Sequence, residues 1–256
     1  MRLALEEIAV HPLIEKLSLI LCYPRPSPGT LEFRIASLRE LGVQAVFLEG
    51  GTVLSGLRVM GKGHVGVVMK VGVEGGFAAA KLRRVDAVRE SMVREAEYLE
   101  LANACGVGPR LMAYSKDVLL MELVEGLKIG EWLREVSDQK VLHAVVTDVL
   151  RQCRRLDGAG LDHGELSKAY GHVFVDAEGR PWIVDFETAS RLRKPKNVTS
   201  LVQYLFLRQG RSEKIREHYG HIEDARLRAA LRTYRRNPGE GTFEAILREI
   251  DPDTKL

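Results

Sequence analysis

Residues 61–81 read GKGHVGVVMKVGVEGGFAAAK, and this stretch decides the fold of the first half of the chain. Its valines and other apolar residues are interrupted by glycines, a pattern typical of short strands joined by tight turns. The pattern predicts one strand over 65–71 and another over 77–82. The glycine pair at 75–76 follows an acidic residue and predicts a hairpin turn between these strands. A preceding strand is expected to end near Met60.

The glycines of this stretch have the spacing G-x-G-x-x-G. In a dinucleotide-binding fold this pattern opens a helix, but here a strand follows it. A glycine loop between two antiparallel strands lets the backbone fold over nucleotide phosphates, because no side chain obstructs the approach. We therefore expect nucleotide contacts from Gly61, Lys62, Gly63, Gly66 and Val68. A glycine hairpin without a ligand is the alternative interpretation.

Lys81 ends the apolar run AAAK on the second strand of the hairpin. An apolar strand has little reason to end in an inward lysine unless an anion lies beside it. In the protein-kinase pattern, which this order resembles, a glutamate on the next helix, here expected over 85–104, holds such a lysine in place. Glu95 is the candidate, because it lies one helical turn before an apolar residue. Glu90 and Glu97 are its rivals, and a solvated helix face is the default interpretation for any one of them.

The composition changes from strand-rich to helix-rich near residue 125. The run VLLMELVEG fits a buried strand that leads into a linker, where Glu122 and Val124 would offer backbone groups to an adenine edge. We expect an N-terminal extension over 1–55, a strand-rich lobe over 56–125 and a helical lobe over 126–256. This segregation of strands and helices indicates an α+β fold with two lobes.

The remaining apolar periodicity predicts mainly helices. The expected elements are helices over 4–21, 31–41, 129–136 and 141–159, four helices after Asn197, and a short hairpin made of 173–175 and 182–185.

Two acidic clusters flank that short hairpin. The stretch LDHGELSKAYGHVFV places Asp162 and Glu165 before it, and IVDFETAS places Asp185 and Glu187 at the end of its second strand. Several carboxylates gathered in one place repel one another unless cations are present. Mg²⁺ with a polyphosphate would relieve this repulsion. The alternative interpretation is a pair of ordinary surface turns.

Taken in order, the glycine loop, strand lysine, helix glutamate, HGEL stretch and DFE triplet resemble the protein-kinase-like fold over residues 58–191. The short C-terminal lobe is similar to that of RIO- and KEOPS-type atypical kinases. The phrases GKGHVG, EAEYLELANACGVGP, DHGELS and VDFETAS resemble a family of small archaeal proteins known as predicted Ser/Thr kinases. This family includes the archaeal tRNA 2′-hydroxyl kinase. The resemblance implies a bilobal fold with a minimal C-lobe, an extra N-terminal segment, and ATP and Mg²⁺ as cofactors.

The resemblance also implies a metal site. DFE stands where DFG is usual, so Asp185 matches the Mg²⁺-binding aspartate, with His172 or Glu187 as further ligands. The asparagine position of the family pattern falls on Tyr170 by spacing, or on His172 if two residues are inserted.

A catalytic base is implied in the same way. HGEL stands where HRDL is usual, so Glu165 matches the base position, and Asp162 is its rival if the loop register is shifted. Lys168 could help to neutralise the γ-phosphate, while Lys81 paired with Glu95 would position the phosphates. No APE motif follows, and the activation segment is nearly absent.

Charge is unevenly distributed along the chain. The whole sequence has a net charge of +3, but residues 191–236 contain thirteen basic and four acidic residues, a net charge of +9. A basic lobe next to a phosphotransfer site suits a polyanion such as RNA, and a solvated arginine-rich surface is the alternative. The candidate RNA-binding residues are Arg191, Arg193, Lys194, Lys196, Arg232, Arg235 and Arg236.

The composition restricts the class of protein. The 256 residues are 45% hydrophobic and 29% charged, which excludes an intrinsically disordered chain. Three separated cysteines fit a reducing cytoplasm, and no targeting or membrane-spanning segment is expected. Abundant charged residues and few amides favour a thermophilic source.

Together with the resemblance, which implies the ribose 2′-hydroxyl and tRNA, these observations predict an ATP-dependent RNA kinase with tRNA or another structured RNA as its partner. A Ser/Thr protein kinase with a protein substrate is the second hypothesis. A non-catalytic nucleotide-binding RNA or assembly module is the third. The oligomeric state does not follow from the sequence.

Overall fold

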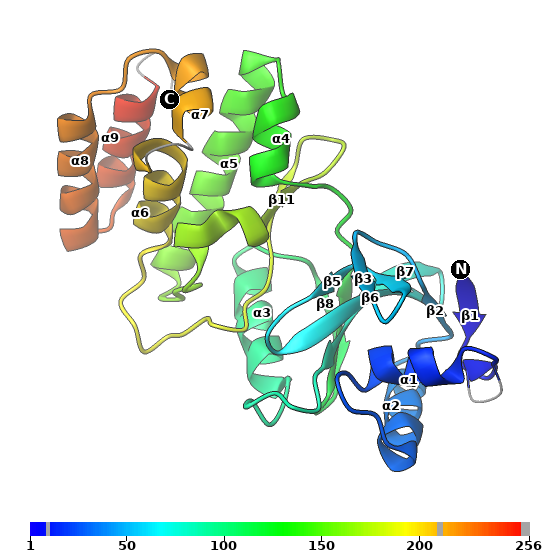
Figure 1. Ribbon diagram of the computed structural model, residues 1–256. Helices are drawn as coiled ribbons and strands as arrows, with labels where there is room; N and C mark the ends of the chain where they lie inside the picture. The colour runs from blue at the N-terminus through cyan, green and yellow to red at the C-terminus, as the bar shows by residue number, and fades with distance from the viewer. Residues whose placement is uncertain (9–10, 209–211, 252–256) are drawn as a thin grey trace. The chain divides into compact units, whose positions relative to one another are not determined.

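The computed structural model describes residues 1–8, 11–208 and 212–251 (Figure 1). Arg211, one of the counted basic residues, lies outside these ranges. The chain divides into two compact units. Unit 1 comprises residues 1–100 and 109–124, and unit 2 comprises residues 101–108 and 125–256.

Unit 1 is built on an antiparallel sheet of seven strands in the order β1-β2-β6-β7-β9-β8, with β5 paired to β6. The strands are β1 (Arg2–Ala4), β2 (Ala45–Phe47), β5 (Gly61–Lys62), β6 (Gly66–Val73), β7 (Gly76–Arg83), β8 (Leu111–Tyr114) and β9 (Val118–Glu122). A separate hairpin consists of β3 (Thr52–Leu54) and β4 (Leu57–Val59).

The central hairpin, β6 with β7, follows the sequence prediction. Side chains of β6 alternate, and Val67, Met69 and Val71 are buried in the core of unit 1. Gly75 turns the chain with a positive φ of 81°, which glycine adopts without strain. Because β7 lies between β6 and β9, its residues are inside the sheet and not at an edge.

Three helices belong wholly or partly to unit 1: α1 (Ile14–Leu21), α2 (Pro28–Glu40) and α3 (Val93–Ala104). The hydroxyls of Ser27 and Thr30 cap the start of α2, and a proline occupies its first turn. In Figure 1, α1 and α2 lie next to each other beside the sheet of unit 1. Their buried leucines and isoleucine join the sheet in one core, so residues 1–55 are an integral part of unit 1.

Two helix predictions in this unit are wrong at their N-terminal ends. The helix expected over 4–21 begins at Ile14, because Arg2–Ala4 form a strand paired with β2 and Pro12 is unfavourable inside a helix. The helix expected over 85–104 begins at Val93. Its first amide hydrogen-bonds to the hydroxyl of Ser91, which ends the preceding irregular segment.

Unit 2 is mainly helical. Its elements are β10 (Leu127–Lys128), α4 (Ile129–Glu135), α5 (Gln139–Gly158), the 3₁₀-helix η2 (Leu166–Gly171), β11 (Val173–Val175), β12 (Pro181–Ile183), α6 (Asn197–Val202), the π-helix η3 (Gln203–Leu207), α7 (Ser212–Tyr219), α8 (Asp224–Arg236) and α9 (Glu240–Ile250). The strands β10, β11 and β12 form one small antiparallel sheet.

The long helix α5 organises this unit. Asp138 caps it by accepting hydrogen bonds from two amides of the first turn. Its apolar face is buried, including Leu142, Val149 and Leu156. Among the described ranges, no helix has both the length and the apolar character needed to cross a lipid bilayer. The mixed α+β class predicted from the sequence is confirmed.

Candidate active site

Lys81 lies in the middle of the sheet of unit 1, where β7 pairs with both of its neighbours. Its backbone is opposite Val68 on β6 and Leu119 on β9. The residue is only 4% exposed, and its Nζ lies 2.8 Å from Oε1 of Glu95. A buried ammonium group is costly unless an opposite charge lies beside it, so the ion pair explains how this lysine is tolerated.

Glu95 is the glutamate that the fold selects from the three candidates. It lies in the first turn of α3, where the helix dipole favours a negative charge, and it is 2% exposed. Glu90 and Glu97 are exposed to solvent. The ion pair predicted between Lys81 and Glu95 is therefore present.

The glycine loop is a narrow turn between β5 and β6. Gly61 and Lys62 pair with β6, and the amide of Gly63 donates to the carbonyl oxygen of Gly66 at 2.8 Å. A Cβ atom at position 66 would lie 2.9 Å from Cγ of Lys81. Glycine is required there because the lysine stem passes too close for any other side chain.

The N-terminal extension contacts this loop. Nζ of Lys62 donates to the hydroxyl of Tyr23 at 3.2 Å and lies 5.0 Å from the centre of the tyrosine ring. Arg84 also lies over the ring and donates to the carbonyl oxygen of Gly63. The extension thus supports one side of the glycine loop, a contact that the sequence did not predict.

Glu122 and Val124 lie at the end of β9 and just after it. The Glu122 carboxylate accepts a hydrogen bond from the amide of Arg110 at 3.0 Å, so this side chain supports the sheet edge. Val124 is half-buried. Their expected contact with an adenine edge stays a prediction.

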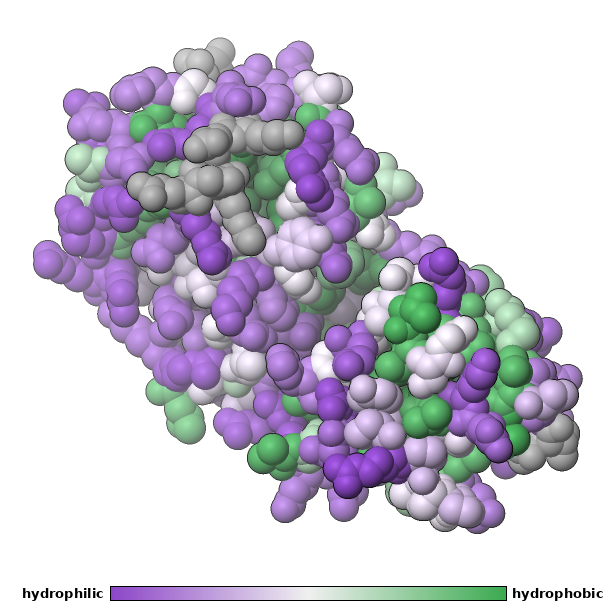
Figure 2. Space-filling view, viewed as in Figure 1, coloured by the Kyte–Doolittle hydropathy of each residue, from purple (hydrophilic) through white to green (hydrophobic). Residues whose placement is uncertain are grey.

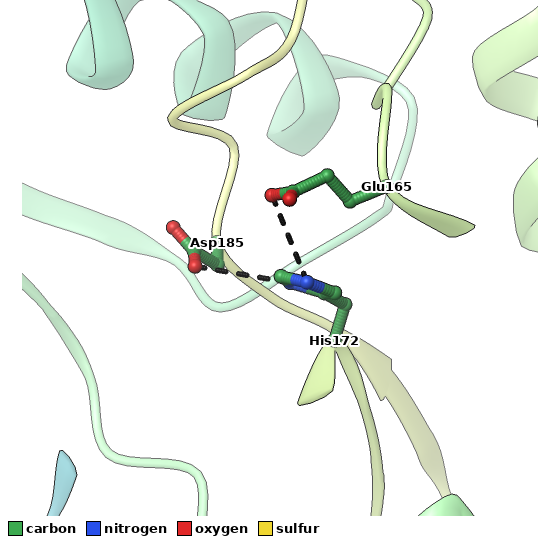
Figure 3. A group of neighbouring side chains, drawn as sticks. All are labelled: Glu165, His172 and Asp185. Carbon is green, nitrogen blue, oxygen red and sulfur yellow. Dashed lines mark ion pairs between the residues drawn. The ribbon is translucent and has the colours of Figure 1, made fainter. Parts of the chain in front are cut away.

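Unit 2 brings Glu165, His172 and Asp185 together (Figure 3). The imidazole of His172 lies between the two carboxylates, with Nε2 3.7 Å from Oε2 of Glu165 and Nδ1 3.8 Å from Oδ2 of Asp185. Glu165 precedes η2, His172 follows it, and Asp185 comes after β12. All three side chains are partly exposed, so a ligand can reach them.

The neighbouring backbone fixes this group. The amide of Val184 donates to the carbonyl oxygen of His172 at 2.9 Å, which ties the end of η2 to the segment after β12. Asp185 has a positive φ of 71°, a conformation that aspartate adopts more readily than most residues. The side chain of Phe186 is buried directly after it. Asp185 is therefore held between two anchored neighbours.

His163 supports the loop from the interior. Its ring is fully buried, and burial together with nearby His172 lowers the pKa of His163 to about 4. The neutral ring lies 3.0 Å from the carbonyl oxygen of Val184 through Nε2, which assigns the proton to that nitrogen. Nδ1 then accepts from the amide of Glu165 at 3.4 Å. The histidine holds the loop in place without carrying a charge.

Asp162, the rival base, has a different environment from Glu165. Its side chain is 1% exposed, against 27% for Glu165. One carboxylate oxygen accepts from Nε of Arg193 at 2.8 Å, and the other accepts from the amide of Lys196 at 3.3 Å. The backbone of Asp162 also pairs with Ser190. This geometry favours Glu165 as the carboxylate that meets a substrate.

The other predicted residues of this loop are spread around the group. Lys168 is exposed on η2. The hydroxyl of Tyr170 donates to Glu131 on α4 at 2.8 Å, so His172, and not Tyr170, lies beside Asp185. Glu187 is partly buried two residues after Asp185.

The candidate RNA-binding residues are all exposed on unit 2. Those of the loop between Ser190 and α6 are Arg191, Arg193, Lys194 and Lys196, and those of α8 are Arg232, Arg235 and Arg236. Arg193 has a second contact, because its guanidinium group binds Asp162. The basic loop is thereby linked to the loop that carries Glu165.

A buried polar network, missed by sequence analysis, supports the same loop. Asn197 accepts a hydrogen bond from the amide of His163 at 2.9 Å and donates to Asp157 at 2.8 Å. Asp157 also accepts from the hydroxyl of Tyr234 on α8 at 2.9 Å. Burial raises the pKa of Asp157. Its position near the end of an amphipathic helix gave no signal of this role.

A lysine and glutamate pair beside a glycine hairpin in unit 1, and an acidic group around a histidine in unit 2, define a kinase-like α+β protein. The chain matches the family model of the RIO domain over residues 67–203. This match covers more than half of the 256 residues, and the chain belongs to the RIO domain family. RIO domains are atypical protein-kinase-like domains, so the predicted kinase-like fold is confirmed.

The chain is also similar to an uncharacterized protein, MJ1211, of Methanocaldococcus jannaschii. The two are 28% identical over 98 residues, which cover 38% of this chain and 82% of that protein.

Proposed function

We propose that this chain is an ATP- and Mg²⁺-dependent kinase that transfers the γ-phosphoryl group to a ribose 2′-hydroxyl of structured RNA, with tRNA as the substrate class. The group made of Glu165, His172 and Asp185, in a chain of the RIO domain family, carries the proposal. Kinase-like proteins need little covalent chemistry from their side chains, so positioning and charge neutralisation account for most of the rate.

The residues of unit 1 are suited to hold phosphates. We assign the α- and β-phosphates to Lys81, whose ammonium group is fixed by Glu95 at 2.8 Å. The glycines of the loop carry no side chain that would hinder a phosphate, and the absence of a Cβ atom at Gly66 leaves room for the stem of Lys81. Of the loop residues, Gly61, Gly63 and Gly66 present no side chain to a phosphate.

The residues of unit 2 fit a divalent cation. The donor atoms of Glu165, His172 and Asp185 lie within 4.8 Å of one another. Nδ1 of His172 is buried and makes no hydrogen bond within the described part of the chain, as expected of an atom reserved for a ligand. Bound Mg²⁺ would neutralise the charge of the phosphates, with Asp185 as the main ligand and His172 or Glu187 beside it.

Glu165 is assigned the role of base. The ribose oxygen forms a bond to the γ-phosphorus while the bond from that phosphorus to the bridging oxygen breaks, and its electron pair leaves with ADP. The hydroxyl proton moves to a carboxylate oxygen of Glu165. Lys168, an exposed residue of η2, is assigned the neutralisation of the transferred group.

Two features favour RNA as the phosphoryl acceptor. Residues 191–236 have a net charge of +9, which attracts a polyanion. The stretch between Glu187 and α6 is short and basic, so it does not provide the extended platform on which peptide substrates bind. A rigid folded substrate could present its own hydroxyl to the site.

A Ser/Thr protein kinase is the second candidate function. Membership of the RIO domain family, which is protein-kinase-like, favours it. The partly exposed side chain of Glu165 would serve a serine hydroxyl by the same proton transfer.

A transfer assay with γ-labelled ATP separates these functions. An unmodified tRNA transcript and a mixed protein extract are offered together, and the labelled RNA is digested with nuclease to locate the phosphate. Label on a ribose 2′ position supports the proposal, and label on protein alone supports the second candidate. Binding of ATP without any transfer would indicate a non-catalytic module.

Variants assign the chemistry to the site. Glu165→Gln keeps the size of the side chain but cannot accept the proton, so transfer should fall by at least about a hundredfold. Glu178→Gln removes an equivalent charge from the exposed turn between β11 and β12 and should have no effect. Equal rates for the two variants would contradict the role of Glu165.

A further inference from the structure

Unit 2 has a small pocket on the side formed by α6, η3 and α8. Its volume is about 150 Å³. It is lined by Thr199, Gln203, Leu207, Arg228, Leu231, Arg232 and Arg235. The pocket is therefore lined by three arginines, by the hydroxyl side chain of the buried Thr199 and by the side-chain amide of Gln203.

The arginines form one row along α8. The buried positions of this helix are Leu227, Leu231 and Tyr234. Arg228, Arg232 and Arg235 each lie one residue after a buried position, so the helical repeat of 3.6 residues brings them to one stripe at the edge of the core. The packing of α8 thus fixes the backbone positions from which the three arginine side chains extend.

The opposite wall consists of Thr199, Gln203 and Leu207, which are four residues apart. In a regular α-helix each step of four residues drifts around the axis by about 40°, so such a row would turn away from the pocket. The second step lies in the π-helix η3, whose wider turn needs less rotation per residue and counteracts the drift. π segments occur frequently at functional sites. Here the π segment keeps Leu207 on the pocket wall.

The arginines have little compensating charge. Arg228 lies 3.8 Å from Asp224, and both side chains are about half exposed, so this pair is weak. Within residues 1–8, 11–208 and 212–251, no ion pair is formed by Arg232 or Arg235. The surface over α8 is mostly hydrophilic (Figure 2). Like charges around one pocket repel one another unless an anion binds between them.

The size and chemistry of the pocket restrict the anion. A volume of about 150 Å³ is below the range of about 300–1,000 Å³ for drug-sized ligands, so a nucleotide does not fit. A phosphate group is small enough, and guanidinium groups bind its oxygens in pairs. We propose that this pocket binds one backbone phosphate of the RNA substrate. The inference rests on the proposed RNA-kinase function.

The pocket has a fixed position relative to Glu165 because both belong to unit 2 and share the buried network. Tyr234, on the helix of the arginines, donates to Asp157, and Asn197 at the start of α6 links Asp157 to the loop of Glu165. A phosphate held in the pocket would therefore fix the position of a rigid RNA relative to the catalytic base, Glu165. The pocket selects which ribose is modified.

Charge variants with a matched control test the contact. Arg232→Gln and Arg235→Gln line the pocket, whereas Arg226→Gln removes the same charge from α8 at an exposed ion pair with Glu223. Binding of a tRNA transcript is measured by filter retention without ATP, over a range of salt concentrations. Each pocket variant should raise Kd about tenfold and lower the slope of log K against log salt by about 1. In the double variant, the slope of log K against log salt should decrease by no more than in either single variant, because both arginines bind the same phosphate.

A size variant separates the pocket from general charge. Gln203→Trp fills the pocket and leaves all three arginines in place, so RNA binding should weaken at unchanged net charge. Equal Kd values for Arg226→Gln and the pocket variants, or an unaffected Gln203→Trp, would overturn the inference. Displacement of RNA by poly-glutamate as effectively as by unlabelled tRNA would also overturn it, in favour of an acidic protein partner. If RNA binds through the pocket but is never phosphorylated, the proposed reaction fails while the pocket stands.

Discussion

Replacing Asn197 by alanine should destabilise the chain far more than its small size suggests. The side chain is 1% exposed and joins three separate groups. Its carbonyl oxygen accepts from the amide of His163 at 2.9 Å, and its amide nitrogen donates to the carbonyl oxygen of Leu161 at 2.7 Å and to Asp157 at 2.8 Å. The substitution removes all three hydrogen bonds at once.

The magnitude follows from the groups that lose a partner. A buried polar group left without a hydrogen bond costs about 1–3 kcal/mol. Asp157 retains the backbone amide of Asn197 and the hydroxyl of Tyr234, so its loss lies at the lower end. Together the three losses give about 3–7 kcal/mol. This is a large part of the 5–15 kcal/mol by which a typical domain is stable.

Urea unfolding followed by far-UV circular dichroism measures this loss. Asn237→Ala is the matched control, because Asn237 is exposed at the end of α8 and its removal should change the free energy by less than about 0.5 kcal/mol. The slope of the transition should be unchanged, so the midpoint reports stability directly. A loss below about 1 kcal/mol for Asn197→Ala would refute the reasoning, since it would mean that water or another group replaces these bonds.

Three other measurements test the site. Lys81→Met should cost about 3–5 kcal/mol in urea unfolding because it leaves the Glu95 carboxylate buried without its cation, and adding Glu95→Gln should restore much of the stability but none of the transfer activity. Burial lowers the pKa of His163 from 6.5 to about 4 in the folded chain. Between pH 4 and pH 6.5, the unfolded chain therefore binds a proton that the folded chain does not bind. The free energy of unfolding should therefore fall by about 3 kcal/mol as the pH drops from 6.5 to 4. The metal-free His163→Gln variant should show a smaller fall. An identical pH profile for the two proteins would contradict the lowered pKa of His163. An imidazole ligand favours Co²⁺ over Mg²⁺ more than an amide does, so the ratio of transfer rates with Co²⁺ and Mg²⁺ should decrease in His172→Asn, and an unchanged ratio would argue against His172 as a ligand.

The sequence was most informative where a local pattern has only one physical solution. The glycine pair after Glu74 predicted the central hairpin, because glycine is favoured at a positive φ. The pairing of Lys81 with Glu95 was predicted from the kinase-like order of a strand lysine followed by a glutamate on the next helix. In both cases a short stretch of sequence carried the signal.

Long-range contacts were not predictable in the same way. The amides of Leu3 and its neighbours pair with β2, about forty residues away, and no local signal competes with the helical periodicity seen there. Asn197 and Arg193 are ordinary polar residues in sequence, and their partners Asp157 and Asp162 lie more than thirty residues upstream. A polar side chain can be buried and hydrogen-bond two distant segments, or it can be exposed to solvent. Which of these occurs depends on tertiary packing, which cannot be read from the local sequence.

The buried ion pair of β7 and α3 also affects how relatives of this chain can change over time. Loss of either Lys81 or Glu95 alone removes one half of a buried ion pair, so we expect both single-step intermediates to be less stable than the ancestor or the double replacement. A lineage that abandons phosphate binding should therefore exchange the two positions together. Descendants that retain one and not the other should be rare, and where they occur a compensating cation or acid should be found nearby in the sheet.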